Sequence, residues 1–286
     1  MSDIFAHAIG NSHSIYFGTY FKNFRCYNVG ATLAYSLGQD KVSKTNGKAH
    51  VLEILKFIKH DEQIIFTFGE IDCRAHLLKQ VKTQNSSIQQ VTEACAKSYM
   101  KFINEIKEMG YNNIMIWGIP ASSSDILPPV KRYPRIGSCK DRNKTTEELN
   151  NRIEEKCVKL GCQFISIFPY LIDENYETKP EFYTDGVHLG GNSAKLTAEE
   201  FKKHGHDTTV KFNKRPESIK GFYSRKKKPI KIARNLQERS ISYEQALSEV
   251  NFYIWKFSVL SKGILAADVH HAELVKEELK LLYGEK

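Results

Sequence analysis

The sequence of 286 residues contains no apolar run that approaches the roughly 20 residues needed to span a bilayer. Its first residues, Met1-Ser2-Asp3, lack the basic region of a signal peptide, and a strand-like run begins at once. These two absences predict a chain without a transmembrane segment that resides in the cytoplasm. Internal repeats and low-complexity tracts are also absent.

Cysteine is sparse and scattered, because the six cysteines include no Cys-x-x-Cys pair. This pattern excludes a dense disulfide framework, and the lack of an export signal favours reduced thiols. Cysteine and histidine never gather at the spacing of zinc ligands, so no metal site is expected.

The formal net charge of +9 comes from one segment of the chain. Residues 202–239 hold 13 Lys/Arg against 3 Asp/Glu, a local charge of +10, which leaves about −1 for the rest. The segment has few aromatic residues and no recognisable nucleic-acid-binding fold, so nucleic acid is not an expected partner. A solvated linker is the simpler interpretation, and contact with an anionic surface is the alternative.

The remainder has the composition of an α/β domain with a real core, at 41% hydrophobic and 11% aromatic residues over the whole chain. Apolar runs predict strands at residues 4–9, 24–29, 63–68, 113–118 and 163–168. Helical patterns predict helices at residues 31–37, 48–59, 87–109, 145–160 and 191–204, the fourth opened by a Thr-x-x-Glu cap. This alternation predicts a flavodoxin-like three-layer α/β/α sandwich with a mainly parallel five-stranded sheet.

Changes in composition divide the chain into three predicted parts. Residues 1–205 form the α/β domain, which carries every candidate catalytic residue, and residues 206–239 form a basic linker or arm. Residues 240–286 show apolar side chains at helical spacing in two stretches, 241–262 and 264–283, which predicts a helical hairpin. Such a hairpin can cover a face of the domain or pair with a second copy of the chain in a homo-oligomer.

A serine stands at the end of the first predicted strand, in the turn Gly10-Asn11-Ser12-His13. Parallel strands bring their working loops together at their carboxyl ends. A serine there can act as a nucleophile if a histidine accepts its proton and N–H groups stabilise the oxyanion. As a lone Gly-x-Ser, Ser12 is more often the N-cap of the next helix.

A second motif, Asp185-x-x-His188, can supply the base. Its short spacing lets the carboxylate meet the imidazole Nδ1–H, which leaves Nε2 free to accept the serine proton. A helix-capping aspartate beside a surface histidine is the alternative for this motif alone.

Four segments together resemble the SGNH/GDSL hydrolase superfamily. Residues 8–14 (AIGNSHS), 28–30 (NVG), 68–72 (FGEID) and 185–188 (DGVH) resemble its first, second, third and fifth blocks, in the family's order. The resemblance covers roughly residues 4–204. It implies that Ser12 is the nucleophile, that His188 shuttles the proton, that Asp185 orients His188, and that the N–H groups of Ser12 and Gly30 form the oxyanion hole.

Two positions depart from the family pattern. Asn11 replaces an aspartate at a position that is generally structural. Ile71 stands where the family has an asparagine that donates to the oxyanion, and losing one such donor typically lowers the rate about 10²–10³-fold. A nearby cationic or imidazole side chain can take its place, with an internal ion pair as the alternative for the cation. The candidate contacts with the substrate or oxyanion are Asn11, His13, Glu70, Arg74 and His76.

The polar, basic stretch 121–143 is predicted to be a substrate-facing loop. Its cationic side chains Arg132, Arg135 and Lys140 suit an anionic sugar or a phosphate, and a solvated loop is the alternative.

The third block, GEIDCR, resembles a subgroup met beside bacterial glycan-assembly enzymes, which implies a carbohydrate substrate. The sequence therefore predicts a serine esterase or O-acyltransferase that acts on an acylated carbohydrate or glycoconjugate through an acyl-serine intermediate. No cofactor is expected, and acetyl-CoA is a compatible acyl donor for transfer. The alternative, which Ile71 favours, is a catalytically silent module of the same fold that binds a glycan or a partner.

Overall fold

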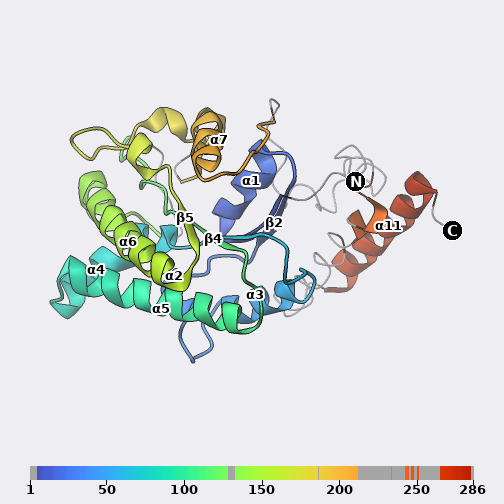
Figure 1. Cartoon of the computed structure of the whole chain (residues 1–286), viewed down its shortest axis with the longest axis horizontal. Helices are drawn as coiled ribbons and strands as arrows, with labels where there is room; N and C mark the ends of the chain where they lie inside the picture. Colours follow the sequence, from blue (N-terminus) through green and yellow to red (C-terminus); the bar gives the residue numbers. More distant parts are fainter. Residues whose placement is uncertain are drawn as a thin grey trace. The chain divides into compact units, whose positions relative to one another are not determined.

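The computed structural model describes residues 5–127, 133–185, 187–211, 233, 242–244, 246–247, 250 and 265–284 (Figure 1). The chain divides into two compact units, Ile4–Asn213 and a second that joins Met1–Asp3 to Lys214–Lys286. Within the described residues, no helix is both long and apolar enough to cross a membrane.

A five-stranded sheet lies at the centre of the first unit. All its strands are parallel and their order is β2-β1-β3-β4-β5, so the predicted fold class is confirmed. Gly10 ends β1, which lies between β2 and β3, and pairs with the last residue of each of them, so three strands end at the same edge. The strands are β1 Ala6–Gly10, β2 Phe24–Asn28, β3 Ile64–Thr67, β4 Ile114–Trp117 and β5 Gln163–Ile165.

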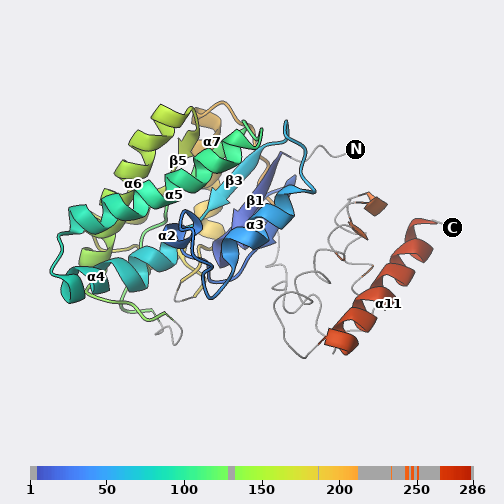
Figure 2. The ribbon, with the colours of Figure 1, turned by 90° about the horizontal axis from the view of Figure 1, so that it is seen from below.

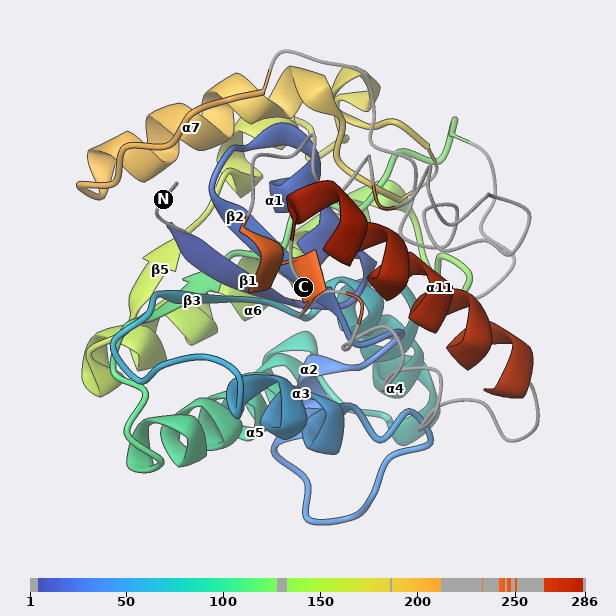
Figure 3. The same cartoon turned by 90° about the vertical axis from the view of Figure 1, so that its right-hand side faces the viewer.

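Helices cover both faces of this sheet. Helices α1 and α7 lie on one face, and α2, α3 and α5 lie on the other (Figure 3). Helix α6 runs beside α5 (Figure 2). The helices of this unit are α1 Ile15–Tyr20, α2 Ala34–Leu37, α3 Gly47–Leu55, α4 Leu77–Gln84, α5 Ile88–Glu108, α6 Cys139–Leu160 and α7 Ala194–Lys203.

Five short helical segments connect these elements. Four are 3-10 turns, and η2 is a stretch of π-helix that leads into α4. They are η1 Ser12–Ser14, η2 Asp72–His76, η3 Phe168–Leu171, η4 Pro180–Phe182 and η5 Gly191–Ser193.

Aromatic side chains fill the space between the sheet and helices α1 and α7. The Trp117 ring of β4 stacks on Phe201 of α7 at a centroid distance of 6.0 Å, and meets the edge of Phe17 of α1 at 5.1 Å. Each such ring, buried from water, contributes about 1.5–3 kcal/mol to folding. This packing fixes α1, the helix that directly follows the Ser12 turn.

The start predicted for the helix at residues 145–160 was wrong. Helix α6 begins six residues earlier, at Cys139, because Ser138 and Asp141 form a reciprocal capping box there. The strand expected at 163–168 is also shorter, because β5 ends at Ile165 and Pro169 lies in a 3-10 turn, where it needs no ladder hydrogen bond.

The start of the predicted basic arm, residues 206–211, is part of the first unit and pairs with the segment at the end of α1. Lys22 donates its backbone N–H to the Thr209 carbonyl at 2.9 Å, and Lys211 donates to the Tyr20 carbonyl at 2.7 Å. Apart from residues 206–211 and 233, the arm lies outside the described residues, as does most of the first stretch of the predicted hairpin. Helix α11 spans Leu265–Tyr283, within the second stretch.

Candidate active site

Ser12, His188 and Asp185 form a continuous hydrogen-bonded chain. Ser12 opens the turn after β1, while Asp185 and His188 lie between η4 and η5. The Ser12 Oγ lies 2.8 Å from the His188 Nε2, and the His188 Nδ1 lies 2.8 Å from the Asp185 Oδ2. This is the arrangement that a serine nucleophile, its base and an orienting carboxylate require.

The Asp185 carboxylate organises the turn that carries the base. Its Oδ1 accepts the backbone N–H groups of Val187 at 2.8 Å and His188 at 2.7 Å, while its Oδ2 meets the His188 ring. Burial opposes ionisation of Asp185, but these hydrogen bonds outweigh it and hold its pKa well below the usual range. An ionised Asp185 fixes a proton on the His188 Nδ1 and leaves Nε2 to face Ser12.

The Ser12 turn is held by the backbone and side chains around it. Asn11 is the N-cap of η1 and accepts the His13 N–H at 3.0 Å, while Ser14 donates to the Asn11 carbonyl at 2.9 Å. A Cβ on Gly10 would lie 1.9 Å from the Thr67 Oγ1, so only glycine fits there. The capping role considered for Ser12 therefore belongs to Asn11, and the Ser12 hydroxyl faces His188.

Gly30, the expected second oxyanion donor, already has an internal hydrogen bond. Its φ of +82° is a left-handed conformation that favours glycine. Its N–H donates to the Asn28 Oδ1 at 2.9 Å. The Gly30 N–H must leave Asn28, or be shared with it, before it can bind an oxyanion.

The third block is buried at the start of the π-helix η2. Ile71, which stands at the family's asparagine position, is 5% exposed. The Asp72 carboxylate accepts the N–H groups of Ala34 at 2.8 Å and Tyr35 at 3.2 Å, at the start of α2. Asp72 thus ties the third block to the helix that follows the Gly30 turn.

The same carboxylate leads to a prediction about stability. Burial raises the pKa of Asp72 from 3.8 to about 6 and outweighs its hydrogen bonds. Between these values the folded protein keeps a proton that the unfolded chain releases, so its stability falls as pH rises. The total loss is on the order of 2–3 kcal/mol.

We expect Asp72→Asn to remove this dependence, because an amide does not ionise. The two N–H groups reach different oxygens of Asp72, so the single amide oxygen accepts only one of them, and the lost hydrogen bond lowers the stability of the variant by the same amount at every pH. Urea unfolding of both proteins at pH 4, 5, 6 and 7 measures it. The free energy of unfolding of the variant minus that of the wild type should rise by on the order of 2–3 kcal/mol between pH 4 and 7. A constant difference across this range would contradict the assignment.

Glu70 and Arg74 form a buried ion pair beside the Ser12 turn. The Arg74 Nε and Nη2 donate to the two Glu70 oxygens at 2.5 and 3.1 Å. The His13 Nε2 lies 3.6 Å from the Glu70 Oε2, and the His13 and His188 ring centroids are 5.2 Å apart. The ion pair considered as the alternative for Arg74 is thus present, with Glu70 as its partner.

The remaining two candidate contacts occupy different surroundings. The Asn11 Nδ2 is buried and makes no hydrogen bond within the described part of the chain. The ring of His76 packs against Tyr133 at a centroid distance of 5.9 Å, and burial together with Lys79 and Arg74 lowers its pKa.

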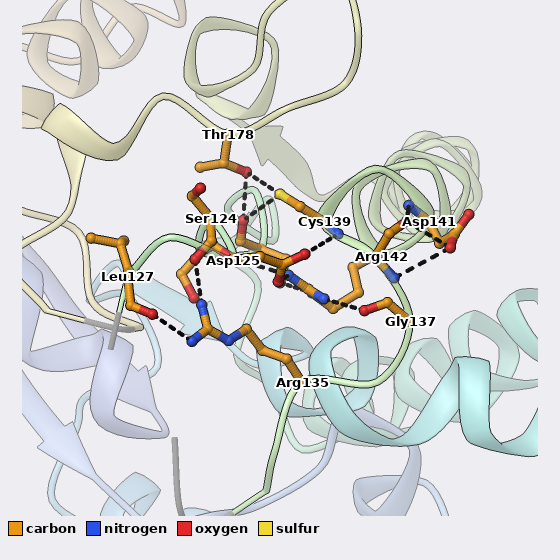
Figure 4. Close-up of polar contacts among 12 residues, drawn as sticks. Ser124, Asp125, Leu127, Arg135, Gly137, Cys139, Asp141, Arg142 and Thr178 are labelled. Atoms are coloured by element: carbon orange, nitrogen blue, oxygen red, sulfur yellow. Dashed lines mark hydrogen bonds and ion pairs between the residues drawn. The ribbon is translucent and has the colours of Figure 1, made fainter. Parts of the chain in front are cut away.

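Side chains from α6 hold the loop after β4 along much of its length (Figure 4). Arg142 is fully buried and donates to the Ser122 Oγ at 2.7 Å, the Gly137 carbonyl at 2.6 Å and the Asp125 Oδ1 at 2.6 Å. Asn143 accepts the Ser122 N–H at 2.8 Å. The described part of this loop is therefore built on α6.

The cationic side chains of this loop are the predicted ligands of an anionic sugar or a phosphate. The Arg135 guanidinium donates to the Ser124 and Leu127 carbonyls, so it links the loop to itself. Lys140 is exposed in the first turn of α6, and Arg132 lies outside the described residues. Sequence reasoning missed Arg142, because a buried arginine and a solvated one look alike in a polar stretch.

All six cysteines are free. Cys73 and Cys95 are buried near the third block, and burial raises the pKa of both thiols. In the described ranges, no three His, Cys, Asp or Glu side chains gather in a way that can hold a metal ion.

No family model and no curated protein matches the chain. Several solved structures resemble it, among them a GDSL-like lipase from Bacteroides thetaiotaomicron, at 13% identity and a TM-score of 0.46 over 70% of this chain and 86% of that one. A Streptococcus pneumonia protein described in relation to platelet activating factor shows 16% identity and a TM-score of 0.49, over 71% and 85%. An acetyl xylan esterase shows 13% identity and a TM-score of 0.42, over 70% and 98%. At these identities, neither a substrate nor a catalytic residue passes from these proteins to this chain.

Proposed function

We propose that this chain is a serine esterase or O-acyltransferase of SGNH/GDSL type in which Ser12 is the nucleophile. The observation that carries the proposal is the chain of two 2.8 Å contacts from the Ser12 Oγ through the His188 ring to Asp185. A hydroxyl, an imidazole and a carboxylate in this order form the machinery of nucleophilic acyl transfer.

In the first half of the proposed reaction, the Ser12 Oγ attacks the carbonyl carbon of an ester while its proton passes to the His188 Nε2. Asp185 stabilises the resulting imidazolium at Nδ1. The tetrahedral intermediate then collapses, the leaving alkoxide takes the proton from His188, and an acyl-Ser12 remains.

In the second half, His188 removes a proton from the acceptor hydroxyl as its oxygen attacks the acyl carbon. The bond from that carbon to the Ser12 Oγ then breaks, and His188 returns the proton to Ser12. A water acceptor gives hydrolysis, and a sugar hydroxyl gives acyl transfer. The N–H of Ser12 is one oxyanion donor in this scheme. The Gly30 N–H becomes the other when it leaves the Asn28 side chain.

The proposed substrate is an acylated carbohydrate or glycoconjugate. Support for this class is the resemblance of residues 69–74 (GEIDCR) to the subgroup found beside glycan-assembly enzymes. Acetyl-CoA suits the acyltransferase form of the reaction, and the proposed site of action is the cytoplasm. Assembly through the C-terminal helices stays a prediction.

A fluorophosphonate probe tests the proposed nucleophile, because it bonds covalently to a serine whose proton is removed by a neighbouring base. We expect one label per chain in the folded protein, at Ser12 by peptide mass spectrometry. Ser12→Ala and His188→Ala should both remain unlabelled, as should wild-type protein in urea. Folded wild-type protein that takes no label would contradict the covalent mechanism.

The second candidate function is a catalytically silent binding module. It is favoured by the apolar Ile71 at the family's donor position and by the engagement of the Gly30 N–H with Asn28. Two results together identify this function. Folded wild-type protein takes no fluorophosphonate label, and wild type and Ser12→Ala hydrolyse p-nitrophenyl acyl esters at equal rates.

A further inference from the structure

The proposed base lies on an exposed turn and needs support. The side chains of His188 and Asp185 are 37% and 41% exposed. Rotation of the His188 ring about its side-chain bonds would break both of its 2.8 Å contacts at once. A misplacement of about 1 Å can lower a rate about 10²-fold, so what restrains this ring matters for the reaction.

A buried ring stands against His188. His13 is 5% exposed, and its ring centroid lies 5.2 Å from that of His188 with an angle of 41° between the ring planes. The backbone of His13 is itself anchored, because its N–H donates to the Asn11 Oδ1 at 3.0 Å. The surface presented to the exposed His188 is thus the side of a fixed, buried ring.

The Glu70–Arg74 ion pair packs against the other side of His13, whose Nε2 makes no hydrogen bond within the described residues. The Glu70 Oε2 lies 3.6 Å from the His13 Nε2, and both Glu70 oxygens accept from Arg74. Arg74 is anchored in turn, because it donates to the Tyr133 carbonyl and accepts the Ile136 N–H. These contacts connect the His13 ring to the loop before α6.

The charges of His13, Glu70 and Arg74 suit a position beside a base that becomes cationic. The Glu70 and Arg74 charges offset each other, and burial lowers the pKa of His13, which favours the neutral form of its ring. A second imidazolium at 5 Å, by contrast, would oppose proton transfer to His188 by like-charge repulsion.

We propose that His13 is a positioning residue for His188, and that the Glu70–Arg74 ion pair fixes the buried His13 ring as the wall that keeps His188 aligned with Ser12 and Asp185. This inference rests on the proposed role of His188. It gives the candidate contacts His13, Glu70 and Arg74 an internal task in place of contact with the substrate.

The rate of fluorophosphonate labelling at Ser12 tests the positioning role of His13, because this measurement requires no knowledge of the natural substrate. We expect His13→Ala to slow labelling about 10–100-fold, since the ring is lost. His13→Phe keeps a ring of similar shape and should recover most of that loss, to within about 5-fold of wild type.

His7→Ala is the matched control. His7 is also a buried imidazole of the same chain segment, 1% exposed, with its Nε2 3.5 Å from Glu62, but it lies in β1, away from the strand's carboxyl end. Its replacement should lower stability and leave the labelling rate within about 2-fold of wild type.

Two labelling results would overturn the proposal. One is labelling of His13→Ala at the wild-type rate. The other is labelling of His13→Phe as slow as that of His13→Ala, which would assign the effect to the ring nitrogens.

Proton NMR of the His188 Nδ1–H that faces Asp185 separates this failure from failure of the proposed function. We expect its downfield signal in wild type and His13→Phe and its loss through solvent exchange in His13→Ala. We expect this NMR difference even if wild-type Ser12 takes no label. An unchanged signal in His13→Ala would also refute the positioning role of His13.

Discussion

Replacing Ser12 by alanine is expected to lower kcat for p-nitrophenyl acetate hydrolysis about 10⁴–10⁶-fold, to the level that binding and oxyanion stabilisation sustain alone. The physical reason is that the 2.8 Å contact with the His188 Nε2 gives one hydroxyl its reactivity. Without the Ser12 Oγ, no acyl-enzyme can form, and water must attack the ester directly. Steady-state hydrolysis at neutral pH measures the loss.

Ser14→Ala is the matched control for this substitution. Ser14 lies in the same turn, but its hydroxyl donates to the carbonyls of Asn11 at 2.9 Å and Tyr27 at 3.2 Å. Its removal should cost about 1 kcal/mol of stability and less than about 10-fold in kcat. Equal losses in the two variants would assign the effect to the turn and refute the role proposed for the Ser12 hydroxyl.

The second large effect is expected at Arg142, where Arg142→Met should lower the free energy of unfolding by about 3–5 kcal/mol. The guanidinium is fully buried, and methionine fills part of its volume without supplying donors. The Ser122 Oγ, the Ser123 and Gly137 carbonyls and Asp125 would each lose a hydrogen bond. Urea unfolding followed by circular dichroism measures the change.

Arg152→Met provides the comparison on the same helix. Arg152 also pairs with carboxylates, Glu93 at 2.9 Å and Glu148 at 2.6 Å, but its side chain is 24% exposed. Removing such a surface pair should cost less than about 1 kcal/mol. Similar losses for both arginines would show that burial of Arg142 adds nothing to the stability of the loop.

The loop that Arg142 holds also reaches the proposed catalytic turn. Tyr183, two residues before Asp185, donates its hydroxyl to the Ala121 carbonyl in this loop. The Arg142→Met variant, assayed where it remains folded, should therefore also label more slowly with the fluorophosphonate. Arg142 thus stabilises the fold and the approach to the site through the same contacts.

Local patterns were sufficient to predict much of this molecule. Apolar runs ended by glycine or proline located the strands, because a buried parallel strand needs such residues and such an end. The Asp185-x-x-His188 spacing predicted their contact, because three residues of turn bring a carboxylate to an imidazole. Ser12 was predicted to lie at the same edge of the sheet as Gly30, because both follow strands that run in the same direction.

Other features were decided only by the tertiary structure, because they depend on which polar groups lose contact with water. Glu70, Arg74 and Arg142 have the same sequence character as solvated side chains, and only the packing around them makes an ion pair or a buried network necessary. The partner of the Gly30 N–H and the ring of His13 against His188 are likewise set by segments that meet in space. The proposed nucleophile and its proposed base could thus be located from the order of residues along the chain, whereas the side chains around them became visible only when the chain was folded.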